Sequence, residues 1–312
     1  MANTICGVDV SSKALDAQVG RSGPFQRFAR NAEGIAELVG FCRAHGVELV
    51  VMEATGGYER LAFALLWEAG LPTAIVNPRA VRDFARGMGF LEKTDRLDAG
   101  IIARYASVAE IAAQQPTSCE QRRLTALVTR LRQLTDLRTA QANQRRLVDD
   151  KTILASIDEI VALINRQIRT IEAEISSLVD QDPLWAKLDT AFRTIKGVAD
   201  RTVAGIMAHL PEIGTLSNKA AAKLAGLAPL ARDSGLSAGK RSVRGGRRDI
   251  RDLLFIVAEV VRRHEPDFQD CYQKMLAAGK PKKVIRVALA RKLLVRLNAK
   301  ARDTRKHFAL AT

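Results

Sequence analysis

Residues 93–105 read Lys93-Thr94-Asp95-Arg96-Leu97-Asp98-Ala99-Gly100-Ile101-Ile102-Ala103-Arg104-Tyr105. The polar start of this stretch and the helical spacing of Leu97, Ile101 and Tyr105 predict a helix that begins among its first residues. Asp95 and Asp98 lie three residues apart and therefore share one face of that helix. Two carboxylates so close either favour the helix N-terminus, as ordinary capping acids do, or hold a cation.

Two further acids stand at the ends of apolar runs. The strand-like stretch from Thr4 to Val10 carries Asp9, and a second such stretch, residues 48–53, ends in Glu53. Open parallel or mixed sheets place ligands beyond the carboxyl ends of their strands, which suits both acids. Four carboxylates fit one or two Mg²⁺ ions, hard cations that take oxygen ligands and assist phosphoryl transfer. The chain has 34 acidic residues, however, so the four acids alone leave a chance grouping open.

The residues around these acids resemble a known family. The matching blocks are Gly7-Val8-Asp9-Val10-Ser11, Met52-Glu53-Ala54-Thr55-Gly56-Gly57-Tyr58 and Lys93-Thr94-Asp95-Arg96-Leu97-Asp98-Ala99. They are similar to the three acidic blocks of the DEDD-type insertion-sequence transposases, which are related to the Piv and MooV invertases. The resemblance implies an α/β RNase H-like (RuvC-like) N-terminal domain. It assigns Asp9, Glu53, Asp95 and Asp98 to a catalytic Mg²⁺ site.

Periodicity along residues 1–115 agrees with an α/β domain. Residues 3–30 read as three strands, and two more strands end at Glu53 and at Val76. Helices are predicted from Asn31 to His45, over residues 58–69, and from Pro78 onward. This alternation predicts a mixed sheet with helices on its faces.

Residues 116–182 are predicted to form a helical coiled-coil arm. Its second helix carries apolar residues at steps of three and four throughout: Leu154, Ile157, Val161, Ile164, Ile168, Ile171, Ile175 and Leu178. Such heptads serve either an antiparallel pairing with the preceding helix, residues 120–150, or contacts between protomers. We expect both, and therefore a homo-oligomer, either a dimer or a tetramer.

Residues 183–312 are predicted to be mostly α-helical. Around Gly197 the sequence resembles a helix-hairpin-helix, whose turn amides contact phosphates, but a plain packing turn is an equal alternative. A loop rich in Gly and Ser follows near residue 235 and leads into a basic helix that begins at Arg247 or Arg248. The glycines of this loop permit close approach of its backbone to a phosphate.

The same segment resembles the C-terminal transposase domain of the DEDD family, in which a serine before glycine is the nucleophile. Carried over, that residue is Ser234, and Ser237 and Ser242 are alternatives. A serine hydroxyl needs a metal, a base or cationic neighbours to attack phosphorus. Without the resemblance, a serine that merely completes a turn would be the simpler interpretation.

Basic residues crowd this C-terminal region. Residues 280–306 contain eleven Lys or Arg and a single Asp, interleaved with apolar residues, so one face packs while the other attracts a phosphate backbone. The alternative is that this basic face contacts only solvent and binds no nucleic acid. The candidate nucleic-acid contacts are Arg232, Lys240, Arg241, Arg244, Arg247, Arg248, Lys282 and Lys283.

Composition limits the class of partner. A net charge of +15 in a chain with 47% hydrophobic residues favours a folded protein that binds nucleic acid. We expect no membrane association, because no apolar run reaches the length of about 20 residues of a membrane span. We expect a cytoplasmic protein associated with the prokaryotic nucleoid. The four cysteines form no CxxC pair, so neither zinc nor a disulfide framework is indicated.

The sequence therefore predicts a transposase that cuts and rejoins donor and target DNA through a serine–DNA intermediate. The resemblance further implies that acids and serine meet between protomers and that a structured noncoding RNA encoded by the element guides the protein. One alternative is a sugar-kinase-like or actin-like (ASKHA-type) ATPase, because residues 7–13 also resemble the first phosphate loop of that superfamily. Another is a non-catalytic nucleic-acid scaffold.

Overall fold

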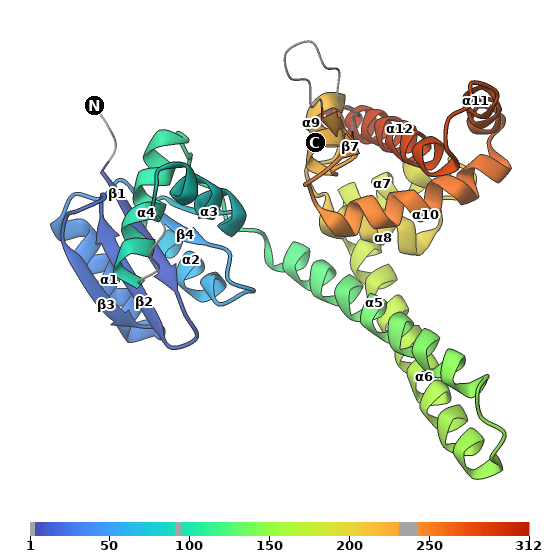
Figure 1. The fold of residues 1–312 in the computed structure, drawn as a ribbon, viewed down its shortest axis with the longest axis horizontal. Coiled ribbons are helices and arrows are strands. Elements are labelled where there is room, and N and C mark those ends of the chain that lie inside the picture. The colour runs from blue at the N-terminus through green and yellow to red at the C-terminus, as the bar shows by residue number, and fades with distance from the viewer. Residues whose placement is uncertain (1–3, 91–94, 231–241, 312) are drawn as a thin grey trace. The chain divides into compact units, whose positions relative to one another are not determined.

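The computed structural model describes residues 4–90, 95–230 and 242–311. The chain divides into two compact units, Met1–Thr117 and Ser118–Thr312 (Figure 1). Each unit has a hydrophobic core that can be described by itself.

The first unit is built on a five-stranded mixed sheet. Its strands are β1 (Ile5–Val10), β2 (Ala14–Val19), β3 (Phe25–Ala29), β4 (Leu49–Glu53) and β5 (Thr73–Val76), in the order β3-β2-β1-β4-β5. The first three strands form an antiparallel meander, while β4 and β5 run parallel to β1. The mixed sheet predicted from the alternating pattern is therefore present.

Helices cover both faces of this sheet. Its helices are α1 (Ala32–Ala44), α2 (Glu59–Glu68), α3 (Pro78–Gly87) and α4 (Asp95–Val108). The predicted cap is present, because the Asn31 side chain accepts a hydrogen bond of 2.9 Å from the amide of Gly34. Buried residues of α1 and α2 share one core with Val8 and Met52, and buried residues of α3 and α4 share another with Val51.

The second unit begins with two long helices, α5 (Cys119–Arg145) and α6 (Lys151–Gln181). They lie side by side and run antiparallel (Figure 1). Ion pairs join Arg123 to Glu174 at one end of the pair and Arg145 to Asp158 at the other. The apolar stripe predicted on α6 faces inward, since Ile157, Ile164 and the equivalent later positions are buried.

In the part of the second unit that the structure describes, six more helices and a short two-stranded sheet follow. These are α7 (Pro183–Arg193), α8 (Asp200–His209), α9 (Asn218–Leu224), β6 (Pro229–Leu230), β7 (Ser242–Val243), α10 (Arg248–His264), α11 (Pro266–Ala277) and α12 (Lys282–Ala311). Their core contains Phe192 and Phe268, both fully buried. The buried Asn298 side chain accepts from the amide of Gly214 and donates to the carbonyl of Leu216, so α12 is fixed to the segment between α8 and α9.

None of the helices in the described residues combines the length and the apolar character needed to cross a bilayer.

Candidate active site and nucleic-acid interface

Three of the four predicted acids line one cavity of about 700 Å³ in the first unit. Asp9 lies near the carboxyl end of β1, Glu53 ends β4, and Asp98 lies in the first turn of α4. All three side chains are partly exposed. The acids are separated widely in the sequence, so only the fold brings them to the same cavity.

Strand register explains why Asp9 and Glu53 come together. β1 and β4 are parallel, with Gly7 beside Val51 and Val8 beside Met52, so Asp9 and Glu53 follow at the same level. Side chains alternate between the faces of a sheet. Because Val51 contacts the core beneath α3 and α4, the alternation directs both acids to that face.

A glycine lets α4 approach closely enough to add the third acid. A Cβ atom on Gly7 would lie 2.0 Å from the carbonyl oxygen of Ala99 and 2.6 Å from the amide nitrogen of Ala103. Only a residue without a side chain therefore fits on β1 below the helix. Asp98 directly precedes the alanine in this contact, so the packing at Gly7 determines its distance from the sheet.

The fourth acid, Asp95, begins α4, but its side chain lies outside the part that the structure describes. Among the described side chains, no group of three or more His, Cys, Asp or Glu is close enough to hold a metal ion. The donor type nevertheless fits a hard cation, because Asp9, Glu53 and Asp98 offer only carboxylate oxygens. The three acids come from different elements, β1, β4 and α4, and line the cavity together.

The turn after Glu53 is organised by an acid that the sequence did not single out. The buried Glu59 carboxylate accepts hydrogen bonds from the amides of Thr55 and Gly57, at 3.0 and 2.9 Å. Burial opposes ionisation of this carboxyl, but the amide hydrogen bonds prevail and its pKa is lowered. Gly56 and Gly57 adopt positive φ, which a side chain would strain. Glu59 thus fixes the cavity wall next to Glu53.

A further acid near the site is fully engaged. Asp16 on β2 is the strand partner of Asp9 and is almost completely buried. Both of its carboxylate oxygens accept hydrogen bonds from the guanidinium of Arg27, at 2.7 and 2.8 Å. This bidentate pair gives the buried carboxylate a cationic partner within the protein.

Basic side chains line the same cavity. Arg82 and Arg86 come from α3, one helical turn apart, and Phe90 completes that side of the cavity. The sequence places both arginines on a helix after β5, but the spacing of four residues did not by itself indicate a site. Their position beside the acids is information that only the fold provides.

The predicted nucleophile lies outside the described residues. Ser234, Ser237, Arg232, Lys240 and Arg241 all belong to residues 231–241. The ends of this segment are described: Leu230 pairs with Ser242 in the β6–β7 ladder. The third serine candidate, Ser242, is exposed at this ladder.

Glycines after this segment pack against protein backbone. A Cβ atom on Gly246 would lie 2.2 Å from the amide nitrogen of Gly226, and one on Gly226 would lie 2.2 Å from the carbonyl oxygen of Gly245. The Arg251 guanidinium donates to that same carbonyl at 2.6 Å. These two glycines therefore serve a contact within the protein. The predicted glycines at 235 and 239 lie outside the described residues.

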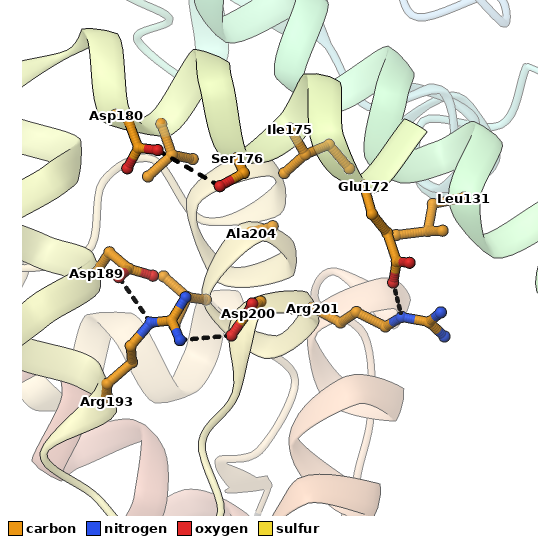
Figure 2. Close-up of a pocket in the computed structure, with 12 residues that line it drawn as sticks. Leu131, Glu172, Ile175, Ser176, Asp180, Asp189, Arg193, Asp200, Arg201 and Ala204 are labelled. Carbon is orange, nitrogen blue, oxygen red and sulfur yellow. Dashed lines mark hydrogen bonds and ion pairs between the residues drawn. The ribbon is translucent and has the colours of Figure 1, made fainter. Parts of the chain in front are cut away.

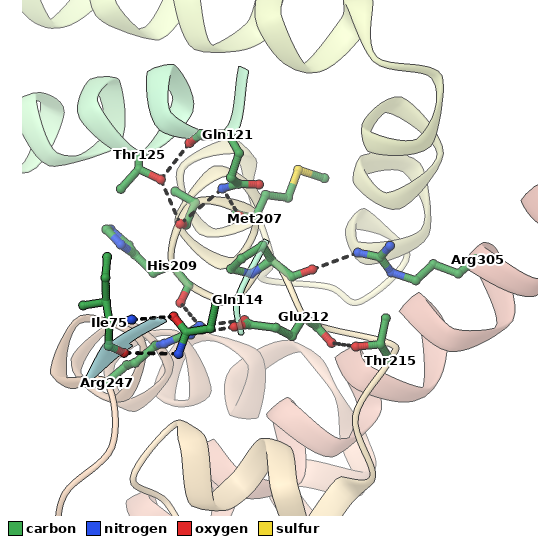
Figure 3. Close-up of polar contacts among 12 residues, drawn as sticks. Ile75, Gln114, Gln121, Thr125, Met207, His209, Glu212, Thr215, Arg247 and Arg305 are labelled. Carbon is green, nitrogen blue, oxygen red and sulfur yellow. Dashed lines mark hydrogen bonds and ion pairs between the residues drawn. The ribbon is translucent and has the colours of Figure 1, made fainter. Parts of the chain in front are cut away.

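Arg247 is held within the second unit (Figure 3). Its guanidinium donates two hydrogen bonds of 2.6 Å to the carboxylate of Glu212 and one of 2.9 Å to the carbonyl of His209. Burial raises the pKa of Glu212, but the hydrogen bonds from Arg247 outweigh this and leave it lowered. The neighbouring Arg248 is exposed and pairs with Asp252 on its own helix.

Three predicted nucleic-acid contacts remain available to solvent. Arg244, Lys282 and Lys283 are exposed, and no ion pair joins them to another residue in the described part of the chain. Other basic residues of α12 are engaged: Arg296 pairs with Glu265 and Asp267, and Arg305 donates to two backbone carbonyls. The basic face is thus only partly free.

The turn at Gly197 has a packing explanation. Gly197 has a φ of +97°, and a Cβ atom there would lie 3.1 Å from the backbone of Val261 on α10. Nearby, Arg193 pairs with Asp189 and Asp200, and Arg201 pairs with Glu172, around a cavity of about 250 Å³ (Figure 2). Asp200, which would repel phosphate, is therefore neutralised by Arg193.

The arrangement in the first unit has a clear chemical meaning. Carboxylates on one side of a cavity attract cations, and guanidinium groups on the other side attract phosphate oxygens. An anionic phosphodiester cannot bind carboxylates directly without a cation between them. The cavity therefore has the charge pattern of a site for metal-assisted chemistry on a phosphate ester.

Two regions of the chain match transposase families. Residues 6–150 match the DEDD transposases of IS110 type, and residues 189–273 match the IS116/IS110/IS902 transposase family. The chain is 30% identical to the pilin gene-inverting proteins of Moraxella lacunata and of Moraxella bovis, over 98% of this chain and 98% of each relative. It is 28% identical to the transposase of element IS1111A from Coxiella burnetii, over 46% of this chain and 34% of that protein.

Proposed function

This chain belongs to the IS110-type family of transposases and DNA-inverting recombinases, and from that premise we propose that it cuts and rejoins DNA at a metal centre in its first unit. It is a DNA recombination enzyme. The observation that carries the proposal is the convergence of Asp9, Glu53 and Asp98 on one cavity. The family relationship over the whole chain favours recombination over an ASKHA-type ATPase.

We propose that the first unit has the RuvC-like form of the RNase H fold. The strand order and the placement of the acids near the ends of β1 and β4 and at the start of α4 support this assignment. Asp9, Glu53, Asp95 and Asp98 would hold one or two Mg²⁺ ions, which polarise a scissile phosphate and stabilise the leaving oxygen. Glu59 keeps the turn beside Glu53 in place, and Gly7 keeps α4 close to β1.

Ser234 is the proposed nucleophile. Its Oγ forms a bond to phosphorus, the bond from phosphorus to the sugar oxygen breaks, and the serine proton passes to the leaving hydroxyl. The resulting phosphodiester between serine and DNA keeps the bond energy for rejoining, when a DNA hydroxyl attacks and releases the serine.

Nucleic acid would bind along the exposed cations of the second unit. Arg244, Lys282 and Lys283 are the best-supported contacts, because they are exposed and free of ion pairs within the described residues. Arg232, Lys240 and Arg241 remain proposals from the sequence. The proposed partners are donor and target DNA and a structured RNA encoded by the element, which would read sequence by base pairing.

The arm of α5 and α6 is the proposed contact between protomers. Leu137, Ile153, Ile160 and Leu163 expose between 43% and 51% of their surface, although each lies on a helix of the paired arm. Apolar side chains in such number on one exposed helix pair favour a further partner. A second copy would bring a Ser234 loop and an acid site from different protomers together.

The test of the metal site is strand cleavage by conservative variants. Asp9→Asn, Glu53→Gln and Asp98→Asn keep side-chain size and remove one charge each. In the presence of the element-encoded RNA, we expect each variant to lose Mg²⁺-dependent cleavage of a labelled duplex that spans one end of the element, while DNA binding persists. Wild-type cleavage in all three variants would refute the metal site, and absence of cleavage in the wild-type protein would favour a binding scaffold.

The test of the nucleophile is the covalent adduct. We expect wild-type protein and labelled DNA to form a band that survives denaturing electrophoresis, and Ser234→Ala to abolish it. Ser242→Ala and Ser237→Ala serve as matched controls on the same segment. An adduct that persists in Ser234→Ala and disappears in a control variant reassigns the nucleophile to that serine.

A further inference from the structure

The cavity that holds the candidate acids has a second wall of opposite charge. Arg82 and Arg86 line it from α3, while Asp9, Glu53 and Asp98 line it from the sheet and α4. Both arginines are exposed, and no ion pair or hydrogen bond joins either side chain to another residue in the described parts of the chain. Two cations thus face the acid site without a protein partner there.

Packing of α3 fixes this orientation. The helix begins at Pro78, and the Asn77 side chain caps it by accepting from the amide of Arg79 at 2.9 Å. Val81 is buried, and Phe84 meets Tyr105 of α4 edge-to-face with ring centres 5.6 Å apart. These contacts anchor α3 on α4 and leave the side chains at positions 82 and 86, four residues apart, on the cavity side.

The chemistry of the wall selects its ligand. A guanidinium binds two phosphate oxygens at once and stays charged at any physiological pH. A volume of about 700 Å³ is within the range of small-ligand sites and accommodates a backbone phosphate with its sugar. The acids opposite exclude a bare anion from their own side, so an anion in this cavity must lie against α3.

We propose that Arg82 and Arg86 form a clamp for a phosphate of the DNA backbone beside the scissile bond. The clamp positions the strand so that the neighbouring phosphate lies over Asp9, Glu53 and Asp98. This inference rests on the proposed function, because it assumes that the cavity takes DNA. The two arginines are positioning residues, and a displacement of about 1 Å at a reacting phosphate costs about 10²-fold in rate.

The first measurement is DNA binding without cleavage. The full-length protein is titrated with a labelled duplex that spans one end of the element, in EDTA, at several salt concentrations. In Arg82→Gln/Arg86→Gln the slope of log K against log salt should become shallower by about 0.9, because the clamp neutralises one phosphate and each neutralised phosphate contributes about 0.9. Arg79→Gln is the matched control, since Arg79 is exposed on the same helix but does not line the cavity.

A slope unchanged in the double variant overturns the clamp. The clamp is also overturned if Arg79→Gln makes the salt slope shallower by as much per replaced arginine as the double variant does, because the effect would then belong to the whole helix. Arg82→Lys/Arg86→Lys keeps the charge and should retain the salt slope while losing cleavage rate, since lysine lacks the planar fork. Thermal unfolding curves of all variants should coincide, because the replaced side chains are exposed.

The second measurement locates the phosphate. Single phosphates of the duplex are replaced by neutral methylphosphonates, and binding is compared between wild type and Arg82→Gln/Arg86→Gln. One replacement next to the cut should weaken wild-type binding and have no further effect on the double variant, as expected for two groups in contact. If the losses of binding free energy from the phosphate replacement and from the double variant add up at every position, the proposal is overturned.

Failure of this inference is separable from failure of the proposed function. If Asp9→Asn loses cleavage while Arg82→Gln/Arg86→Gln cleaves like Arg79→Gln, the metal site stands and the clamp falls. If Asp9→Asn cleaves normally, the proposed function falls, and the binding measurements still report whether α3 holds a phosphate.

Discussion

The two units use their charged residues in different ways. In the first unit, Asp9, Glu53 and Asp98 come from three separate elements and meet at one cavity that also contains two arginines. In the second unit, conspicuous arginines such as Arg247 and Arg296 bind acids of the same unit. The density of charge in a sequence therefore identifies a class of partner, whereas the fold decides which charges can reach that partner.

The largest expected effect comes from the glycine beneath α4. Gly7→Ala puts a methyl group 2.0 Å from the Ala99 carbonyl, so α4 must move away from β1. We expect a loss of about 3 kcal/mol in unfolding free energy of the first unit, as for severe overpacking. Cleavage should fall by about 10²-fold or more as Asp98 is displaced. Thermal unfolding and a cleavage assay measure the two effects.

Gly40→Ala is the control for this prediction. Gly40 lies inside α1, and a Cβ atom there meets nothing within 4 Å. Alanine in a helix is more favourable than glycine by up to about 1 kcal/mol, so this variant should be as stable as wild type or more stable. Equal behaviour of Gly7→Ala and Gly40→Ala would show that the close approach of α4 to β1 does not shape the site.

A smaller effect is expected in the core of the second unit. Asn298 is fully buried and engaged at its oxygen by Gly214 and at its nitrogen by Leu216 and Asn218. Asn298→Ala leaves the buried amide of Gly214 without its acceptor and should cost about 2 kcal/mol of unfolding free energy. The exposed Asn143 on α5 is the control, and Asn143→Ala should change stability by less than about 0.5 kcal/mol. Chemical denaturation of both variants measures the two changes in unfolding free energy. Equal losses of stability in Asn298→Ala and Asn143→Ala would contradict a stabilising role of the buried Asn298 side chain.

The smallest effect concerns Arg247. Its pair with Glu212 is partly exposed, so Arg247→Gln should cost only about 1 kcal/mol. The lowered pKa of Glu212 means that the pair stabilises the fold at neutral pH and that this contribution disappears as the pH falls through the carboxyl range. The stability difference between wild type and Arg247→Gln should therefore vanish in acid, as followed by urea unfolding at several pH values.

Arg248→Gln is the matched control for that series. Arg248 is strongly exposed and pairs only within its helix, so its replacement should leave stability nearly unchanged at every pH. A salt-dependent loss of DNA affinity in Arg248→Gln but not in Arg247→Gln would show that the strongly exposed cation reaches DNA, whereas the cation held by Glu212 and His209 does not. The opposite pattern would show that Arg247 leaves Glu212 to bind nucleic acid.

Much of the first unit follows from local sequence patterns. Alternation and turn residues locate all five strands, and the apolar runs place Asp9 and Glu53 near strand ends. The cap at Asn31 follows from the same local rules. Such features depend on neighbours in the sequence, which is why they are readable from it.

Other features depend on contacts between distant residues. Arg27 pairs with the buried Asp16 across two neighbouring strands. The position of Arg82 and Arg86 beside the acids arises from packing of α3 on α4. No spacing rule indicates these contacts, because each depends on how elements meet in the fold.

Divalent-metal binding by the full-length protein tests the central claim most directly. Mn²⁺, a spectroscopically visible substitute for Mg²⁺, is titrated into wild type, Asp9→Asn, Glu53→Gln and Asp98→Asn and followed by electron paramagnetic resonance. Glu68→Gln, an exposed acid at the end of α2, is the control. We predict that wild type and Glu68→Gln bind Mn²⁺ with the same affinity and that each of the other three variants binds it at least about tenfold more weakly. Unchanged Mn²⁺ affinity in those three variants would contradict the account.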